Sequence, residues 1–285
     1  MKILLVLLLI FPIADAYSQT NRKVFDVHLH GSPDRASQLV ELRAAGVYKA
    51  AISTSWELQN SYQGDSTLQI LFGLMFPCPN GKVPYSLQDC YSDQKEWPPV
   101  KWVEEQIAAG KIDYFGEVLN QYYGISASDS LLFTYYALAV KYNIPVGIHT
   151  GGAGPNHGSP NFKMEFGNPV FLKEVLQKFP RLKLWIMHSG DQFYKETIDL
   201  MRTNKKVYAD ISVISNPAIV PAAHFATIMK AFIAAGLEDR LLFGTDNGDV
   251  KSIIRSVEKL SSLTEKQKQK IFYQNAEAFF SVNNP

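Results

Sequence analysis

The chain has 285 residues, of which 46% are hydrophobic, and a formal net charge of +1. This composition supports a large buried core and excludes a disordered chain. The near-neutral charge, without any segment dense in Lys or Arg, argues against a nucleic-acid-binding protein. The function classes that these properties leave are a small-molecule enzyme and a binding protein.

The N-terminal stretch is typical of a secretory signal peptide. It begins with Lys2, continues with apolar residues from 3 to 13, and then carries the small residues Ala14 and Ala16. A basic start, an apolar core of about 7–15 residues and an A-x-A-like cleavage site define such a segment. A membrane anchor needs about 20 apolar residues, and Asp15 ends the run too early. We therefore expect residues 1–18 to be cleaved and residues 19–285 to be exported to the periplasm or secreted.

Export bears on Cys78 and Cys90, which are the 2 cysteines of the chain. In an oxidising compartment such a pair can form a disulfide. Both lie in one stretch rich in Pro and Gly, so we expect a disulfide that closes a single loop. Two unrelated thiols are the alternative.

Short apolar runs rich in β-branched residues alternate with longer amphipathic stretches. The predicted strands are residues 23–30, 47–54, 68–76, 113–119, 144–150, 183–189, 206–212 and 240–246. Helical patterns include residues 37–46, 98–110, 129–143, 168–180 and 225–236. This alternation predicts an α/β fold with a parallel sheet covered by helices. Eight strands in a chain of this length favour a single-domain (β/α)8 TIM barrel, with residues 77–99 as a loop insert. An open doubly wound sheet is the alternative, but its usual glycine-rich phosphate turn is absent from the sequence.

Metal-competent side chains recur where predicted strands end, which is where active sites form in this barrel. They are His28, His30, Glu117, His149, His188 and Asp246. Because strand side chains alternate, His28 and His30 point to the same side. A buried, hydrogen-bonded core residue is the ordinary explanation for any one of these histidines. Burying all six groups at one rim without a cation or a hydrogen-bond network costs several kcal/mol. The pattern therefore favours a metal site, with zinc first and manganese, iron or nickel as alternatives.

The ordered set "DVHLHG", "GEV", "GIHTG", "MHSG" and "FGTDNG" resembles the metal-dependent amidohydrolase superfamily, most of all its amidohydrolase-related branch (amidohydrolase 2). The resemblance implies that His28 and His30 are ligands of the more buried metal and that Asp246 contacts that metal or its water. It implies that His149 is a ligand of one or two metals. His188 would bind a second metal or act as an acid/base group beside a single one. Glu117 is expected as a ligand, with orientation of a histidine as its alternative role.

The resemblance also implies the chemistry. One or two divalent ions per chain, with Zn²⁺ first, would activate water to cleave a C–N or C–O bond in an amide, lactone or ester. Asp246 would carry the proton from the attacking water to the leaving group. A metal-dependent decarboxylase of a small aromatic acid is the alternative, and a non-catalytic metal-bearing binding barrel is the third possibility.

The loops around the predicted site say less about the substrate. His157 and Lys163, within residues 150–169, are candidates for recognising a substrate carboxylate or phosphate, with solvated loop residues as the alternative. Tyr122 and Tyr123, together with the insert, can form an aromatic wall or simply cover the barrel, and His224 is expected at the surface or at a helix start. The expected partner is a small-molecule substrate, with neither nucleic acid nor membrane. The sequence leaves open whether the protein forms a homo-oligomer.

Overall fold

The computed structural model describes residues 22–64, 67–93, 95–152 and 157–281, so the predicted signal peptide lies outside the described residues. Eight parallel strands pair in the order β1 to β8, each with the next along the chain. The strands are β1 (Val24–His30), β2 (Val47–Thr54), β3 (Gln69–Phe76), β4 (Tyr114–Val118), β5 (Val146–Ile148), β6 (Leu184–Ile186), β7 (Val207–Asp210) and β8 (Leu241–Leu242). The predicted single-domain TIM barrel is confirmed.

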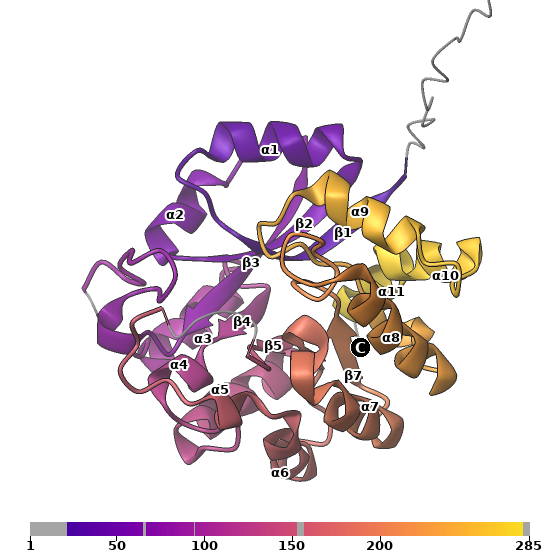
Figure 1. Ribbon diagram of the computed structural model, residues 1–285. Coiled ribbons are helices and arrows are strands. Elements are labelled where there is room, and N and C mark those ends of the chain that lie inside the picture. The colour runs from indigo at the N-terminus through magenta and orange to yellow at the C-terminus, as the bar shows by residue number, and fades with distance from the viewer. Residues whose placement is uncertain (1–21, 65–66, 94, 153–156, 282–285) are drawn as a thin grey trace, which may run out of the picture.

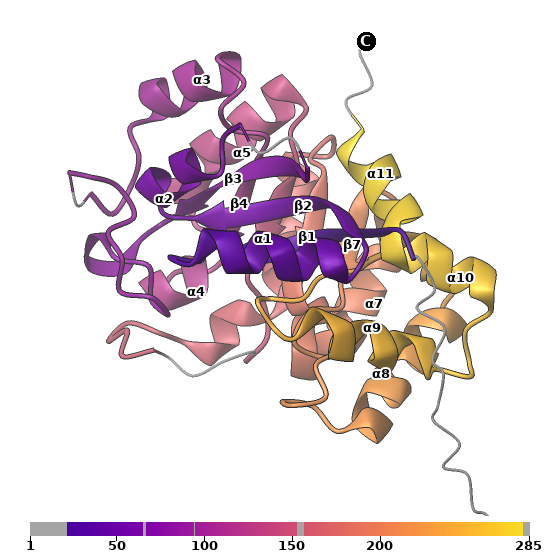
Figure 2. The same ribbon diagram turned by 90° about the horizontal axis from the view of Figure 1, so that it is seen from above.

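Helices connect the strands and surround them on the outside (Figures 1 and 2). They are α1 (Arg35–Ala44), α2 (Trp56–Ser61), α3 (Val100–Ala108), α4 (Asn120–Tyr123), α5 (Ser130–Tyr142), α6 (Leu172–Lys178), α7 (Tyr194–Thr203), α8 (Ala222–Ala234), α9 (Val250–Glu258), α10 (Glu265–Gln269) and α11 (Asn275–Phe280). Shorter 3-10 turns are η1 (Pro79–Gly81), η2 (Met164–Gly167), η3 (Pro169–Phe171), η4 (Met187–Phe193) and η5 (Glu238–Arg240), and η6 (Lys270–Gln274) is a π-helical turn. In the described part of the chain, none of the helices combines the length and the apolar character needed to cross a bilayer.

The two ends of the chain meet where the barrel closes. The backbone N–H of Val27 donates to the carbonyl of Phe243 at 2.9 Å, and that of Asp246 donates to the carbonyl of His28 at 2.8 Å. The π-helical turn η6 and α11 both pack against β1. Closure therefore brings the end of β1 beside the loop that follows β8.

An aromatic cluster fills the barrel below the strand ends. The ring of Trp185 lies 5.2 Å from that of Tyr114 and 5.4 Å from that of Phe280 in α11, and Phe25 also contacts Phe280 at 5.4 Å. Each of these strand residues precedes a metal-competent residue by three positions: Phe25 precedes His28, Tyr114 precedes Glu117, and Trp185 precedes His188. The polar groups therefore lie above an apolar floor that excludes water from below.

The later strands are shorter than predicted. β5 and β6 have 3 residues each, and β8 has 2. His149 and Asp246 consequently lie in the loops just beyond β5 and β8, and His188 lies in the 3-10 turn η4 just beyond β6. The chain turns sharply there, with φ of 59° at His188 and 50° at Asp246, which are left-handed values that a strand does not contain.

The predicted helix over residues 168–180 is divided into the 3-10 turn η3 and the helix α6. A 3-10 turn is a common way to begin a helix, and the Asn168 side chain caps this one by accepting from the backbone N–H of Val170. The loop of residues 150–169 has no α-helix in its described part, as predicted.

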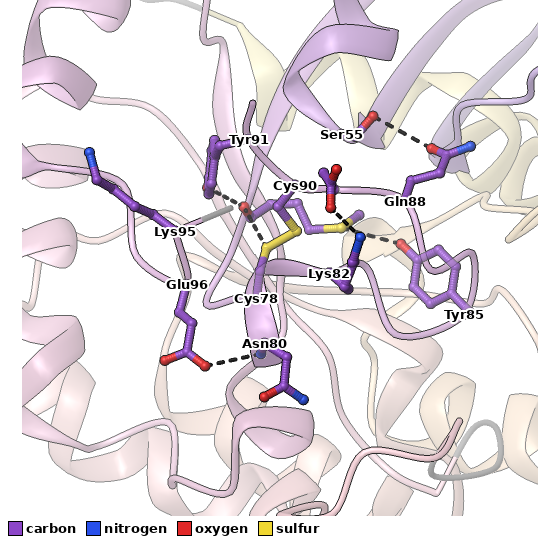
Figure 3. Close-up of a disulfide and its surroundings, with 12 residues drawn as sticks. Ser55, Cys78, Asn80, Lys82, Tyr85, Gln88, Cys90, Tyr91, Lys95 and Glu96 are labelled. Atoms are coloured by element: carbon purple, nitrogen blue, oxygen red, sulfur yellow. Dashed lines mark hydrogen bonds and ion pairs between the residues drawn. A yellow bond between two sulfur atoms is a disulfide. The ribbon is translucent and has the colours of Figure 1, made fainter. Parts of the chain in front are cut away.

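The predicted insert lies between the end of β3 and the start of α3, and Cys78 and Cys90 within it form the expected disulfide (Figure 3). A short antiparallel bridge pairs Lys82 with Asp89 inside the closed loop. The backbone N–H of Trp56, the first residue of α2, donates to the carbonyl of Cys90 at 2.9 Å. The insert is therefore fastened to the barrel at its disulfide.

Candidate metal centre

The six predicted metal-competent residues come together at the carboxyl ends of the strands. His28, His30, Glu117, His149 and His188 are buried, and the Asp246 side chain is 23% exposed. Three overlapping groups have ligand atoms within 4.8 Å of one another: His28, His30 and Glu117; Glu117, His149 and His188; and His28, His188 and Asp246. Glu117, on β4, is shared by the first two groups.

The carboxylate of Glu117 lies at the middle of the cluster. Its Oε1 is 3.5 Å from Nε2 of His188 and 3.8 Å from Nε2 of both His28 and His149. Its Oε2 is 3.6 Å from Nε2 of His30. Asp246 also lies close to two of these histidines, with Oδ1 2.9 Å from Nε2 of His30 and 3.8 Å from Nε2 of His28. All four histidines thus direct Nε2 toward carboxylate oxygens.

The opposite ring nitrogen of each histidine faces a hydrogen-bond acceptor. Nδ1 of His28 lies 3.0 Å from Oδ2 of Asp210, and Nδ1 of His30 lies 3.1 Å from the carbonyl of Ser53. Since a carboxylate and a carbonyl only accept, these Nδ1 atoms carry the hydrogen. Neutral imidazole then has its lone pair on Nε2.

The same tautomer follows for the other two histidines. Nδ1 of His149 is 2.8 Å from Oε1 of Gln121, whose amide nitrogen donates to the carbonyl of Gly151. Nδ1 of His188 is 2.9 Å from Oγ of Ser212, and that hydroxyl donates its own hydrogen to Asp210. Four Nε2 lone pairs and two carboxylates therefore converge on one region.

A divalent cation fits this set of donors. Nε2 of His28 and Oε1 of Glu117 are buried and have no hydrogen-bond partner within the described residues. Two electron-rich atoms left in this way are costly unless a cation lies between them. Ligands about 2.0–2.2 Å from a tetrahedral ion stand roughly 3.3–3.6 Å apart, close to the spacing of 3.5–3.8 Å around Oε1 of Glu117. Acceptors that hold Nδ1 are the usual support of a metal-binding histidine.

The protonation states of Glu117 and His149 suit metal binding as well. Burial by itself raises the pKa of Glu117, but the surrounding histidines, His149 first, outweigh it and lower this pKa to about 2. Burial lowers the pKa of His149 to about 4. At neutral pH the carboxylate is thus ionised and this imidazole is neutral, as a ligand pair requires. Burial lowers the pKa of His28, but Asp210 outweighs it and raises this pKa to about 10, so a metal would replace a proton on Nε2.

Asp210 was not among the residues predicted for the site. It is fully buried at the end of β7 and accepts from Nε1 of Trp185 and from the backbone N–H of His188, besides contacting His28. A carboxylate inside the apolar run "VYADIS" was the available signal. Gln121, Ser53 and Ser212, which also hold histidines, are residue types too common in sequences to stand out.

A cavity of about 610 Å³ lies over the cluster. Its lining combines polar groups of the site with apolar and aromatic residues of the loops: His30, Gly31, Ser53, Thr54, Val83, Tyr85, Ser86, Glu117, Tyr122, His149, His157, His188, Val213, Ile219, Asp246 and Asn247. No Lys or Arg belongs to this lining in the described part of the chain. The internal segments outside the described residues, 65–66, 94 and 153–156, contain neither Lys nor Arg in their sequence.

The loop residues predicted for substrate recognition occupy different places. His157 lines the cavity, with its ring 5.9 Å from that of Tyr122. Lys163 is exposed and not part of the lining, and its ammonium lies over the ring of Phe166. His224 is exposed in the first turn of α8. Tyr123 bonds to Glu96 away from the cavity.

Solved structures with this fold include hydrolases and decarboxylases. An uncharacterised TIM-barrel protein from Bordetella bronchiseptica has a TM-score of 0.63 and 17% identity, over 90% of this chain and 98% of that chain. A 2,6-dihydroxybenzoate decarboxylase from Rhizobium has a TM-score of 0.60 and 12% identity, over 92% of this chain and 100% of that chain. Dihydroorotase from Saccharomyces cerevisiae, in complex with 5-fluoroorotic acid, has a TM-score of 0.64 and 15% identity, over 93% of this chain and 85% of that chain.

No curated protein matches the sequence. The model of the family Amidohydro_2, described as amidohydrolase, matches residues 98–282. That range contains Glu117, His149, His188 and Asp246, whereas His28, His30 and the disulfide precede it. The family and the His/Glu cluster together indicate a divalent metal centre. With a family model covering more than half of its length, the chain belongs to the amidohydrolase family.

Proposed function

We propose that the protein is a metal-dependent hydrolase that cleaves a C–N or C–O bond in an uncharged amide, lactone or ester. The observation that carries this proposal is the convergence of four Nε2 lone pairs and two carboxylates at the base of a cavity of about 610 Å³. His28, His30, Glu117, His149 and Asp246 would hold the ion or ions.

A bound divalent ion lowers the pKa of water toward about 7 and polarises a carbonyl oxygen. Glu117 and Asp246 are the two carboxylates of the cluster that line the cavity, and Asp246 is the more exposed of them. Burial by itself raises the pKa of Asp246, but neighbouring histidines outweigh it and hold this pKa well below the usual range. Asp246 can accept the proton of the attacking water and return it to the leaving group. His188, buried beside Glu117, would either serve as a ligand or stabilise charge on the reacting carbonyl.

The charge of the cavity supports an uncharged substrate. Anionic substrates are commonly held by Arg or Lys, and neither lines the cavity in the described residues. The proposed ions would neutralise Glu117 and Asp246, so away from the metal the lining offers a carboxylate no Lys or Arg partner in the described residues. The apolar side chains of Val83, Val213 and Ile219 suit a body without charge.

Decarboxylation of a small aromatic acid is the second candidate. A 2,6-dihydroxybenzoate decarboxylase shares the fold over 92% of this chain, and a 5-carboxyvanillate decarboxylase shares it over 90%. In that reaction the substrate carboxylate would itself face the metal, so the rest of the cavity would need no cationic side chain. The third candidate is a metal-bearing barrel that binds a small molecule without catalysing a reaction.

Turnover by the metal-loaded protein tests these candidates. The panel is phenyl acetate, dihydrocoumarin, acetanilide and 2,6-dihydroxybenzoate, with 4-acetoxybenzoate as the carboxylated match of phenyl acetate. We expect hydrolysis of a neutral compound and a lower kcat/KM for 4-acetoxybenzoate than for phenyl acetate. Carbon dioxide release from 2,6-dihydroxybenzoate alone would establish the second candidate, and no turnover of any compound the third.

The number of metals bears on Glu117. We propose that the site would hold two Zn²⁺ ions and that Glu117 would be a ligand of both, because the groups His28, His30, Glu117 and Glu117, His149, His188 share this carboxylate. Elemental analysis of the purified protein measures both identity and number. One ion per chain would make Glu117 or His188 a residue that acts beside the metal.

We further propose that the protein works after export. The disulfide between Cys78 and Cys90 is the kind of bond that persists in oxidising compartments, and residues 1–18 have the pattern of a signal peptide. N-terminal sequencing of the mature protein should begin shortly after residue 16 or 18. An intact Met1 on protein recovered from the cytoplasm would contradict this.

A further inference from the structure

The disulfide closes the loop of residues 78–90, called the disulfide loop below, and three residues of this loop line the cavity: Val83, Tyr85 and Ser86. Figure 3 shows Tyr85 on the same loop as the two cysteines. Tyr85 reaches the metal centre. Its hydroxyl is 2.8 Å from Nδ1 of His30, and the two rings are 4.4 Å apart. The insert thus contributes directly to the site.

The hydrogen bonds around Tyr85 leave its own hydrogen without a strong acceptor. Nδ1 of His30 carries a hydrogen because it faces the carbonyl of Ser53 at 3.1 Å. The Tyr85 oxygen must therefore accept from that Nδ1–H, and its phenol hydrogen stays free to donate. The other hydrogen-bonding neighbour is Sδ of Met75 at 3.5 Å, and a thioether is a weak acceptor.

Hydrogen bonds to neighbouring segments also hold the disulfide loop, from Oγ of Ser55 to Oε1 of Gln88 at 3.5 Å and from the backbone N–H of Asn80 to Oε1 of Glu96 at 3.0 Å. Inside it, the backbone N–H of Val83 donates to the carbonyl of Gln88, and that of Cys90 donates to the carbonyl of Gly81. Lys82 pairs with Asp89, but both side chains are about 40% exposed, and exposed pairs hold a loop weakly. The disulfide is the covalent link that fixes where the loop begins and ends (Figure 3).

We propose that Tyr85 is a catalytic residue whose phenol donates a hydrogen bond to a substrate oxygen beside the metal, and that the Cys78–Cys90 disulfide holds it in place. This inference rests on the proposed hydrolase function. The bond would strengthen as negative charge develops on the carbonyl oxygen of an ester or lactone, as other preorganised donors do. The disulfide loop would then be part of the active site and more than a cover of the barrel.

The first test is Tyr85→Phe, which keeps the ring and removes the oxygen. Using the neutral panel compound that the wild type hydrolyses fastest, we expect kcat to fall roughly 100-fold, with zinc content and Tm close to wild type. Tyr123→Phe is the matched control, because Tyr123 donates to Glu96 outside the cavity, and it should retain wild-type kcat. A kcat within twofold of wild type in Tyr85→Phe overturns the role of Tyr85.

The second test asks whether the disulfide acts through Tyr85. Cys78→Ser/Cys90→Ser should lose a large part of the same kcat, and adding Tyr85→Phe to that pair should lower kcat little further, because groups acting as one unit are not additive. Losses that multiply would show that the disulfide acts elsewhere. If the serine pair fails to fold, a phosphine can reduce the disulfide to two thiols in the wild type and in Tyr85→Phe. Comparing kcat of the two reduced proteins then gives the same test.

A binding measurement separates this inference from the proposed function. Acetohydroxamate offers a carbonyl oxygen to a metal site, and its affinity for the zinc-loaded protein is measured by calorimetry. If the wild type hydrolyses no panel compound, the proposed function fails, yet Tyr85→Phe should still bind acetohydroxamate roughly 10-fold more weakly, as expected for a lost hydrogen bond near a charged group. Equal affinities would overturn the role of Tyr85.

Discussion

Asp246 differs from the other residues of the metal centre in its exposure. Its side chain is 23% exposed, whereas those of His28 and Glu117 are 0% and 2% exposed. It also lies on a turn with φ of 50°, and its backbone N–H is held by the carbonyl of His28. A carboxylate held firmly at the edge of the cavity is better placed to exchange protons with water than one buried beneath it.

Asp246→Asn should therefore keep most of its metal but lose turnover. The amide retains one oxygen near His30, but it cannot accept the proton of the attacking water, so kcat should fall about 10²–10⁴-fold. Activity and elemental analysis on the same sample measure both effects. Asp249→Asn is the control, because this exposed cap of α9 loses the same charge and asparagine also caps helices. Full turnover in Asp246→Asn would refute the proton transfer.

Asp210 acts on the metal through His28. Replacement by Asn would place an NH₂ group against hydrogens on His28, Trp185 or the backbone of His188. His28 would lose its orientation, and Zn²⁺ affinity should fall about 10–100-fold. Competition with a chelator measures the dissociation constant. Asp199→Asn, an exposed change on α7, should leave it unaltered. An unchanged dissociation constant in Asp210→Asn would show that the contact with His28 does not support the metal.

At the scale of elements, the order of strands and the placement of histidines at their ends were predictable from sequence. Apolar runs identify strands because their burial on both faces leaves a continuous pattern. The lengths of β5 to β8 were not predictable, since His188 and Asp246 continue apolar runs while their backbones turn. An aromatic contribution from the insert was predictable as one alternative, but the contact of Tyr85 with His30 was not, because it depends on how the disulfide loop folds over the barrel.

Gly244, between β8 and Asp246, allows β1 to approach closely. A Cβ at this position would lie 2.8 Å from Cβ of His28 and 3.3 Å from Cβ of Ser212. Gly244→Ala should displace His28, lower the free energy of unfolding by about 1–3 kcal/mol and weaken metal binding. Chemical denaturation and metal titration measure these effects. Gly152→Ala is the control, because its added Cβ meets only the ends of two flexible side chains, those of Gln192 and Met164. Unaltered metal binding in Gly244→Ala would contradict the role of this close approach.

For the whole molecule, the metal centre joins segments far apart in the sequence. Its residues come from β1, β4 and the loops after β5, β6 and β8, and the barrel closes by backbone bonds between β1 and the segment after β8. Without a cation, the two carboxylates would be balanced only by protons on the surrounding histidines. The same ion that supplies the chemistry is thus expected to stabilise the closed barrel, because these ligands are brought together only in the folded chain.

Metal removal should therefore lower the thermal stability of the entire chain. Zinc at about 100 times its dissociation constant adds about 2.7 kcal/mol to the folded state, which corresponds to a rise in Tm of roughly 5–10 °C for a chain of this size. Calorimetry with and without Zn²⁺ measures it. Glu117→Gln should show a smaller rise, because the central carboxylate of the cluster is lost, and the exposed change Glu41→Gln on α1 should match wild type. An equal rise in Glu117→Gln would mean that the histidines and Asp246 hold the ion without Glu117.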